Sequence, residues 1–437
     1  MKRLRAIAAW AALAAAALLA VPAAPQSGAE DAAGPVHYVK VEGIVNPVMA
    51  EFVTRCIEDA ADDGAEAVVF ELDTPGGLDL SMRRIVKAVL ASEVPVVVYV
   101  APSGARAASA GVFITYAAHI AAMAPGTNIG SAHPVAMGGE EMDETMSRKV
   151  ENDAVAYLRG IAAKRGRNAQ WAEEAVRESV NVTADEALEL NIIDLLVDGR
   201  DDLLTAIDGR AVETVTGRRT LRTEGAEVKE IEMGVRLRIL DAISNPNVAY
   251  ILMMIGLVGL YFELSNPGAV LPGVIGAICL VLAFYAFQTL SVNYAGLILI
   301  ALAVVFFIAE VKVTSFGLLA VAGVVALTLG SLMLFESPLP FMRLSLWVML
   351  PTVAVTALFF LAAMYYAVMI HRRRPVSGDG AIVGERGAAV EDLAPGREGK
   401  VFVVGEYWNA VSDEFIEKGS KIEVTSVDSM TLKVRRL

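Results

Sequence analysis

The chain divides into three stretches that differ in the spacing of their apolar residues. From Val36 onward short apolar runs alternate with amphipathic runs, and from Asn247 to Ile370 the sequence is almost continuously apolar. After Arg374, short alternating segments are separated by glycines. Short buried runs between helical periods predict an α/β domain, whereas long apolar runs predict membrane helices. We therefore expect an α/β domain, a membrane block and a small C-terminal domain.

Strands and helices alternate along the first stretch. The pattern predicts strands over His37–Val45, Ala67–Leu72 and Val94–Val100, and helices over Pro47–Ala61, Asp79–Ala91, Val112–Ala117 and from Lys149 to about Lys164. Asp79 is the expected N-terminal cap of its helix. Alternation at this spacing implies a largely parallel sheet with helices on its outside.

The membrane block contains five apolar segments. They span residues 247–264, 268–288, 294–311, 316–335 and 346–370, and each approaches or exceeds the ~20 residues that a membrane-spanning helix needs. The first is the weakest because Glu263 interrupts its end, so four crossings plus a re-entrant hairpin is an alternative. The basic cluster from His371 to Arg374 marks the cytoplasmic side. An exported N-terminus then requires an odd number of crossings, which five satisfies.

The N-terminus has the pattern of a secretory signal peptide. Basic residues precede an apolar run from Ala6 to Val21, and small residues follow it. This predicts a signal peptide over residues 1–24, cleaved near Ala23 or Ala24. An uncleaved anchor is the alternative, and in either case the next domain is exported.

Composition excludes several classes of protein. Of the 437 residues, 55% are hydrophobic, which is too many for a purely soluble protein. A net charge of −13 without a basic patch argues against nucleic acid binding. Cys56 is in the exported half and Cys279 in an apolar run, so they are expected to be packing residues and not a disulfide or metal site.

Two junctions between elements offer catalytic chemistry. Asp73-Thr-Pro-Gly-Gly77 follows a buried strand, and its glycines could turn backbone amides toward a developing oxyanion. Ser109 lies among Ala and Gly residues where a helix begins, which leaves room for a substrate carbonyl. A small-residue turn of this kind is structural more often than catalytic. Lys149 could serve as a base only if burial depressed its pKa.

These junctions, in this order, resemble those of the NfeD family of membrane-bound serine proteases. The similar stretches are Asp73–Gly77, Gly104–Gly111, Ala121–Gly130 and the helix of Lys149, with further similarity at Tyr261–Gly268, Val292–Gly296 and Gly399–Gly419. The resemblance implies an α/β, Clp protease/crotonase-like ββα spiral, followed by a helical transmembrane block and a small all-β, OB-like barrel. It implies a Ser–Lys dyad of Ser109 and Lys149.

The same resemblance implies the remaining site residues. Gly76, Gly77 and the amide of Ala110 would form the oxyanion hole. Related Clp proteases use a Ser–His–Asp triad, and His133 follows Ser109 by 24 residues, so His133 is the alternative base. No metal or other cofactor is implied.

The expected domains and function follow from the pattern and the resemblance together. We expect a signal peptide over 1–24, a protease domain over 35–230, a membrane block over 245–371 and an OB-like domain over 380–437. The expected protein is a multi-pass endopeptidase of the plasma (inner) membrane, with its protease domain on the exported side and its C-terminal domain in the cytoplasm.

Its expected substrates are hydrophobic peptide segments of membrane-associated proteins, including those of a stomatin-like partner. We further expect contact with membrane lipid, a homo-oligomer and no nucleic acid. The alternatives are a non-catalytic scaffold for stomatin-like proteins and a signal-peptide-peptidase-like enzyme.

Overall fold

The computed structural model describes residues 33–136, 143–265, 268, 270–313, 315, 317–337, 342–372 and 382–437. The expected signal peptide lies outside these residues. The chain divides into two compact units, one formed by Met1–Leu297 with Ser331–Met349 and the other by Ile298–Gly330 with Leu350–Leu437.

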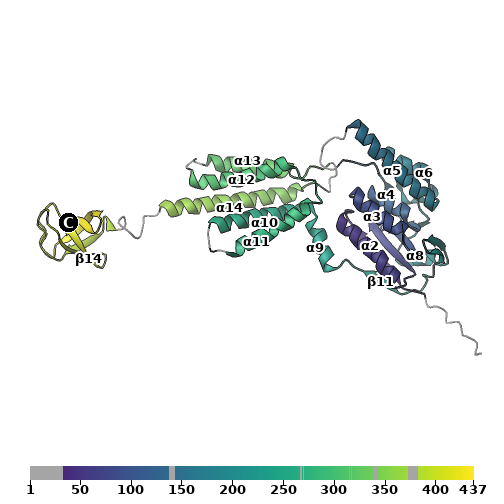
Figure 1. Cartoon of the computed structure of the whole chain (residues 1–437), viewed down its shortest axis with the longest axis horizontal. Coiled ribbons are helices and arrows are strands. Elements are labelled where there is room, and N and C mark those ends of the chain that lie inside the picture. Colours follow the sequence, from purple (N-terminus) through teal and green to yellow (C-terminus); the bar gives the residue numbers. More distant parts are fainter. Residues whose placement is uncertain are drawn as a thin grey trace, which may run out of the picture. The chain divides into compact units, whose positions relative to one another are not determined.

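A six-stranded, wholly parallel sheet organises the N-terminal domain (Figure 1). Its order is β11 (Val228–Ile231), β1 (Val36–Glu42), β2 (Ala67–Asp73), β3 (Val96–Val100), β5 (Ile120–Met123) and β8 (Leu195–Leu196). The central strands β2 and β3 are rich in buried Val, as is typical of a parallel sheet covered on both faces. The expected α/β class is confirmed.

Each face of this sheet carries its own apolar core. Alternate residues such as Val68, Phe70 and Leu72 face a large core with α2 (Pro47–Asp62), α3 (Asp79–Leu90), α4 (Ala110–Ala117), α5 (Glu144–Arg165), α6 (Ala169–Arg177) and α7 (Ala184–Glu189). Val69 and its neighbours on the other face pack with α8 (Arg200–Ile207) and the hairpin of β9 (Ala211–Thr214) and β10 (Gly217–Thr220). The period of two along β2 therefore separates the cores.

A second, smaller sheet leads into the candidate site. It joins β4 (Arg106–Ala108) to β6 (Asn128–Gly130) in parallel and β6 to β7 (Asn181–Thr183) in antiparallel fashion. β4 ends one residue before Ser109, and the Ser109 amide donates to the Gly130 carbonyl at 3.0 Å. This sheet thus fixes the backbone on both sides of the serine.

Two helix boundaries differ from those predicted. Asp79 is the first residue of α3 and not its cap, because Leu78 occupies the cap position and the Asp79 carboxylate accepts from Arg83. α5 begins at Glu144, five residues before Lys149, because the Asp143 side chain accepts from the amides of Thr145 and Met146.

The helix α9 (Val235–Ile243) belongs to the first unit and follows β11. Leu237 is buried in the large core, and Asn46 Nδ2 donates to Asp241 Oδ1 at 2.6 Å. The start of α2 is therefore fastened to the element that precedes the apolar helices.

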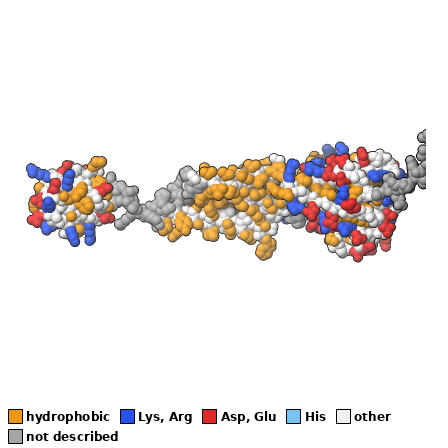
Figure 2. Space-filling view, turned by 90° about the horizontal axis from the view of Figure 1, so that it is seen from below, with side chains coloured by type: hydrophobic (Ala, Val, Ile, Leu, Met, Phe, Trp, Pro, Cys, Tyr) orange, Lys and Arg blue, Asp and Glu red, His pale blue; other side chains and the backbone are white. Residues whose placement is uncertain are grey.

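Five apolar helices coincide with the five expected segments: α10 (Pro246–Ser265), α11 (Val270–Phe287), α12 (Tyr294–Lys312), α13 (Leu318–Met333) and α14 (Leu346–Arg372). Within the described residues, α10, α11 and the part Leu346–Tyr366 of α14 are long and apolar enough to cross a membrane. Tyr294–Glu310 and Leu318–Met333 are shorter. Hydrophobic side chains cover this part of the surface (Figure 2). Five crossings therefore remain a prediction.

Glycines bring α10 and α11 into close contact. A Cβ on Gly276 would lie 2.9 Å from the Gly256 carbonyl oxygen, and one on Gly273 would lie 2.7 Å from Glu263 Cγ. Small residues of this kind let membrane helices approach at their backbones. In the second unit, Glu310 accepts from the Ser315 hydroxyl and from the Gly317 amide at 2.9 Å. The Glu310 carboxylate therefore accepts from amides at the start of α13, where the helix dipole favours a negative charge.

The C-terminal residues form a closed five-stranded barrel in the order β12-β13-β14-β16-β15. Its strands are β12 (Arg386–Ala389), β13 (Gly399–Val403), β14 (Glu406–Val411), β15 (Lys421–Asp428) and β16 (Thr431–Arg436). A small apolar core fills it, with Val401, Val403 and Leu432 fully buried. The expected all-β barrel is confirmed.

Candidate active site

Ser109 occupies a sharp turn between β4 and α4. Its backbone has φ 51° and ψ −108°, a conformation that a residue with a side chain rarely adopts. The turn is held on both sides, because the Ser109 amide donates to Gly130 and its carbonyl accepts from Val112, each at 3.0 Å. A non-glycine residue held at positive φ costs about 1–3 kcal/mol and is concentrated at functional sites. The serine side chain is half-buried.

Gly76 and Gly77 pack directly against this turn. Gly76 has φ +118°, and a Cβ added there would lie 2.8 Å from Ser109 Cβ and 3.2 Å from Ser109 Oγ. A Cβ on Gly77 would lie 2.3 Å from the Val45 carbonyl oxygen. Neither position has room for a side chain. The two glycines were predicted from the Asp73–Gly77 stretch, and the structure brings both to the serine.

The amides around Ser109 differ in what they are free to bind. Gly76 N–H donates to Thr74 Oγ1 at 3.1 Å. Among the described residues no acceptor contacts Gly77 N–H, and Ala110 N–H lies in the first turn of α4, where a helix supplies no acceptor. Gly77 and Ala110 are therefore the amides open to an oxyanion, and Gly76 shapes the turn. Thr74, fully buried and not singled out from the sequence, holds that shape.

A cleft of about 440 Å³ opens beside these residues. Gly77, Ser109, Ala110 and Lys149 line it, together with charged Asp79, Arg83 and Asp153 and apolar Met82, Phe113, Ala132, Pro134, Val135, Val150 and Ala154. Apolar walls around a few convergent polar groups are typical of a binding site for an apolar chain.

Lys149 lies on the cleft-facing side of α5. Val150, Asp153 and Ala154 line the cleft with it, which is the spacing of one helix face. The side chain is exposed, so the burial expected of a lysine base is not present in the structure. The structure thus brings Lys149 into the same cleft as Ser109 without enclosing it.

His133 is directed away from the cleft. Its Nδ1 lies 2.9 Å from the Val176 carbonyl at the end of α6, so that nitrogen is a donor and Nε2 is left as an acceptor. The adjacent residues Ala132 and Pro134 line the cleft, but His133 does not.

The other histidine near the serine helix is structural. His119 Nδ1 accepts from the Val96 amide at 3.1 Å. Burial, together with the nearby charges of Arg165 and Arg167, lowers the pKa of His119 to about 3. A histidine kept neutral in this way is a poor proton carrier at neutral pH.

Three family models match the chain. The NfeD1b N-terminal domain matches residues 35–210, the NfeD integral membrane domain residues 247–366, and the NfeD-like C-terminal, partner-binding domain residues 379–436.

Individual relatives match over nearly the whole length. Membrane-bound protease PH1510 of Pyrococcus horikoshii is 35% identical over 413 residues, 92% of this chain and 93% of that protein. Membrane protein NfeD1b of Bacillus subtilis is 27% identical over 425 residues, 92% of this chain and 93% of that protein. Among solved structures, the 1510-N membrane-bound stomatin-specific protease, crystallised as a lysine-to-alanine variant with a substrate peptide, is 32% identical. Its TM-score is 0.45, and the match covers 48% of this chain and 96% of that one.

Proposed function

Because this chain belongs to the NfeD family of membrane-bound proteases, we propose that it is a serine endopeptidase with Ser109 as nucleophile and Lys149 as general base. One observation carries the proposal. The Ser109 side chain stands at a strained helix start, beside two free amides and in the same cleft as a lysine. Nucleophile, base and oxyanion donors are the three parts that acyl transfer requires.

The first half-reaction forms an acyl-enzyme. Uncharged Lys149 Nζ takes the proton of Ser109 Oγ, and Oγ attacks the substrate carbonyl carbon. The electron pair of the carbonyl bond moves to oxygen, where the amides of Gly77 and Ala110 donate to it. When the tetrahedral intermediate collapses, the C–N bond breaks and the Lys149 ammonium returns the proton to the leaving amine.

The second half-reaction restores the enzyme. Water loses a proton to Lys149 and attacks the acyl carbon through the same oxyanion geometry. The bond between that carbon and Ser109 Oγ breaks, Oγ regains the proton, and the carboxylic product leaves. Each step needs only one base, because Lys149 alternates between accepting and donating.

We favour Lys149 over His133 because Lys149 is a lining residue of the cleft and His133 is not. A triad would also need a carboxylate on the histidine, and among the described residues the hydrogen-bond partner of that ring is a backbone carbonyl.

The remaining expectations complete the proposal. The apolar walls of the cleft favour hydrophobic peptide segments as substrates. A stomatin-like protein is the proposed partner or substrate, because a solved relative is named a stomatin-specific protease. Residues 35–230, 245–371 and 380–437 are the proposed domains. The basic cluster from His371 to Arg374 supports a protease domain on the exported side and a barrel in the cytoplasm.

The test is labelling of the full chain, purified in detergent, with a fluorophosphonate that reacts only with an activated serine. Ser109→Ala is expected to abolish labelling and cleavage of an apolar fluorogenic peptide, and Lys149→Ala to slow both by at least about 100-fold. Ser179, another exposed serine at positive φ, and Lys164, exposed on the same helix α5, supply the matched controls Ser179→Ala and Lys164→Ala.

Two results would overturn the proposal. Undiminished labelling and cleavage in Ser109→Ala would place the nucleophile at another residue. Normal rates in Lys149→Ala with a loss in His133→Ala would move the base to the histidine.

A further inference from the structure

Arg83 of α3 joins its helix to α5 at the cleft, through Asp153, which lies 70 residues later in sequence. Its Nε donates to both carboxylate oxygens of Asp79 on α3, at 3.0 and 2.9 Å, and its Nη2 donates to Asp153 on α5. Its guanidinium also lies over the ring of Tyr157 on α5, 4.5 Å from the ring centroid. Only arginine offers a flat fork that makes both contacts at once.

The contact continues to the helix of the nucleophile. Tyr157 stacks on Phe113 of α4, with ring centroids 6.0 Å apart and an angle of 24° between the planes. Phe113 stands four residues after Ser109 and lines the cleft. Arg83 therefore connects the helix of the proposed base with the helix that begins at the proposed nucleophile.

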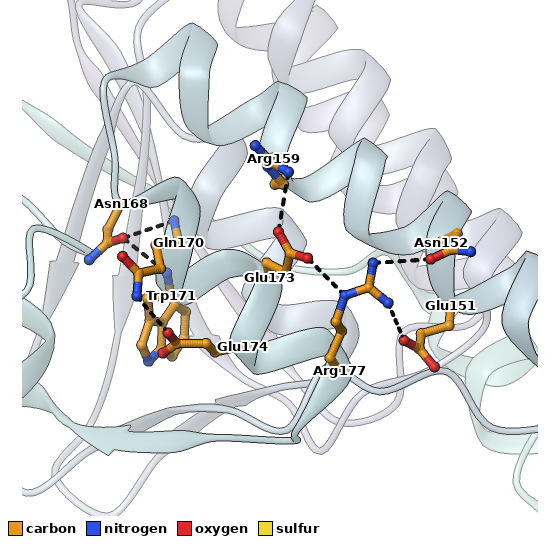
Figure 3. A network of polar contacts seen from close by, with 9 residues as sticks. All are labelled: Glu151, Asn152, Arg159, Asn168, Gln170, Trp171, Glu173, Glu174 and Arg177. Atoms are coloured by element: carbon orange, nitrogen blue, oxygen red, sulfur yellow. Dashed lines mark hydrogen bonds and ion pairs between the residues drawn. The ribbon is translucent and has the colours of Figure 1, made fainter.

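The outer side of α5 is held by a separate network. Arg177 of α6 donates to Glu151 and to Asn152, and it also binds Glu173 on its own helix (Figure 3). Arg159 on α5 binds the same Glu173 (Figure 3). These contacts fix the outer side of α5 to α6. On the cleft side, Arg83 holds α5 to α3.

Arg83 also decides which charge faces Lys149. Asp153 stands at i+4 from Lys149, the spacing at which a carboxylate and an ammonium pair on a helix. Among the residues that the structure describes, the other charged ones lining the cleft are Asp79 and Arg83 itself, and the lining parts of α4 and of residues 132–135 carry no charge. A carboxylate committed to Arg83 is less available to hold Lys149 in its charged form.

We propose that Arg83 is a positioning residue for the Ser109–Lys149 pair. It holds the N-terminal half of α5 against α3 and α4, and it keeps Asp153 from pairing with Lys149. This inference rests on the proposed function, because it assumes that Lys149 must be uncharged to take the serine proton. Asp79 and Asp153 are its two anchors, and Arg83 itself does not touch the reacting atoms.

The test measures the rate of fluorophosphonate labelling against pH in the full chain in detergent. The acid limb of this profile reports the deprotonation of the base. Arg83→Gln removes a positive charge and frees Asp153, so Lys149 should hold its proton more tightly and the limb should move up by about one unit. At a pH on the limb, one unit corresponds to a rate about tenfold lower.

Asp153→Asn breaks the same bridge but removes a negative charge. Its limb should therefore move to lower pH while its plateau rate falls, opposite in direction to Arg83→Gln. Arg83→Lys keeps the charge without the fork, so its limb should stay in place and its plateau should fall. The matched control is Arg84→Gln on the next residue of α3, which is exposed, does not line the cleft and carries the same charge change.

The outcomes separate this inference from the function beneath it. If Arg83→Gln and Asp153→Asn both lower the plateau without moving the limb, Arg83 is merely structural and the inference is wrong. The inference is also wrong if the pH profiles of Arg83→Gln and Asp153→Asn equal that of Arg84→Gln. If Ser109→Ala still labels, the proposed function has failed first. The melting temperature of each variant shows whether it is folded. If one of Arg83→Gln, Asp153→Asn and Arg83→Lys has lost its fold, the pH profiles of the other two still test the inference.

Discussion

Replacing Gly76 by alanine would put a methyl group against the proposed nucleophile. The new Cβ would lie 2.8 Å from Ser109 Cβ, closer than two carbon atoms approach without a shift. An ordinary contact needs at least about 3.4 Å, so the serine side chain would have to move by several tenths of an ångström. A misplacement on the order of 1 Å costs roughly 100-fold in rate, and we expect labelling by the fluorophosphonate to slow by about 30- to 100-fold.

The same change also costs stability, and the two effects can be separated. At φ +118° an alanine is strained, by about 1–3 kcal/mol, offset by the 0.4–1 kcal/mol or so that alanine gains over glycine in the unfolded chain. Gly104→Ala is the matched control, because Gly104 also has a positive φ, +92°, and nothing lies within 4 Å of its Cβ. Both variants should unfold a few degrees earlier. Only Gly76→Ala should lose activity.

The assay is the second-order rate constant of labelling, with the melting temperature measured on the same samples. A Gly76→Ala protein that labels within threefold of Gly104→Ala would falsify the close approach of this glycine to Ser109. A loss of labelling in both Gly76→Ala and Gly104→Ala would show that backbone strain, and not contact with the serine, limits the reaction.

Three further changes test other parts of the structure. Thr74→Val removes the acceptor of the buried Gly76 amide and should cost about 1–3 kcal/mol in urea unfolding and slow labelling, whereas Thr74→Ser should keep most of both. The pKa of His119 is lowered to about 3 in the folded chain, so neutral His119 stabilises the fold fully above pH ~6.5 and less as pH falls toward 3. The free energy of unfolding should therefore drop by about 2 kcal/mol between pH 7.5 and pH 5, and His119→Asn should not show this drop. Gly276→Val places a side chain 2.9 Å from the backbone of α10 and should weaken the α10–α11 pair by about 1–3 kcal/mol in detergent unfolding.

The sequence predicts best where one local pattern dictates one structure. The buried strand Ala67–Leu72 and the helix Pro47–Ala61 lie within one residue of their observed ends. Apolar periodicity specifies such elements, and tertiary contacts only confirm them. The start of α5 was misplaced because its capping residue, Asp143, lies before a polar turn without apolar period. Asp79 satisfied the composition of a cap, yet Arg83 one turn later takes its carboxylate.

The candidate site could be predicted only in part, because no local pattern dictates its tertiary contacts. The glycine pair and Ser109 each lie in a contiguous motif at a strand end, and the sequence shows both motifs. They follow strands of two different sheets, β2 and β4, and meet because a bridge between Thr74 and Ala107 joins those strands. That Gly77 and not Gly76 keeps a free amide depends on Thr74, a contact that no spacing reveals. Arg83 gave one signal, its i−4 relation to Asp79, but its bond to Asp153 required the fold.

The two members of the proposed pair are held by different physics. Ser109 is fixed by backbone bonds and by a glycine that leaves no space, and none of these contacts titrates or is screened by salt. Lys149 is exposed, and the Arg83–Asp153 ion pair in the same cleft has side chains that are 31% and 64% exposed. Such pairs contribute little to stability, yet they set the local charge. A rigid proposed nucleophile beside a proposed base exposed to surface charge implies that pH and ionic strength act on the proposed reaction through α5, while the serine side of the site stays unchanged.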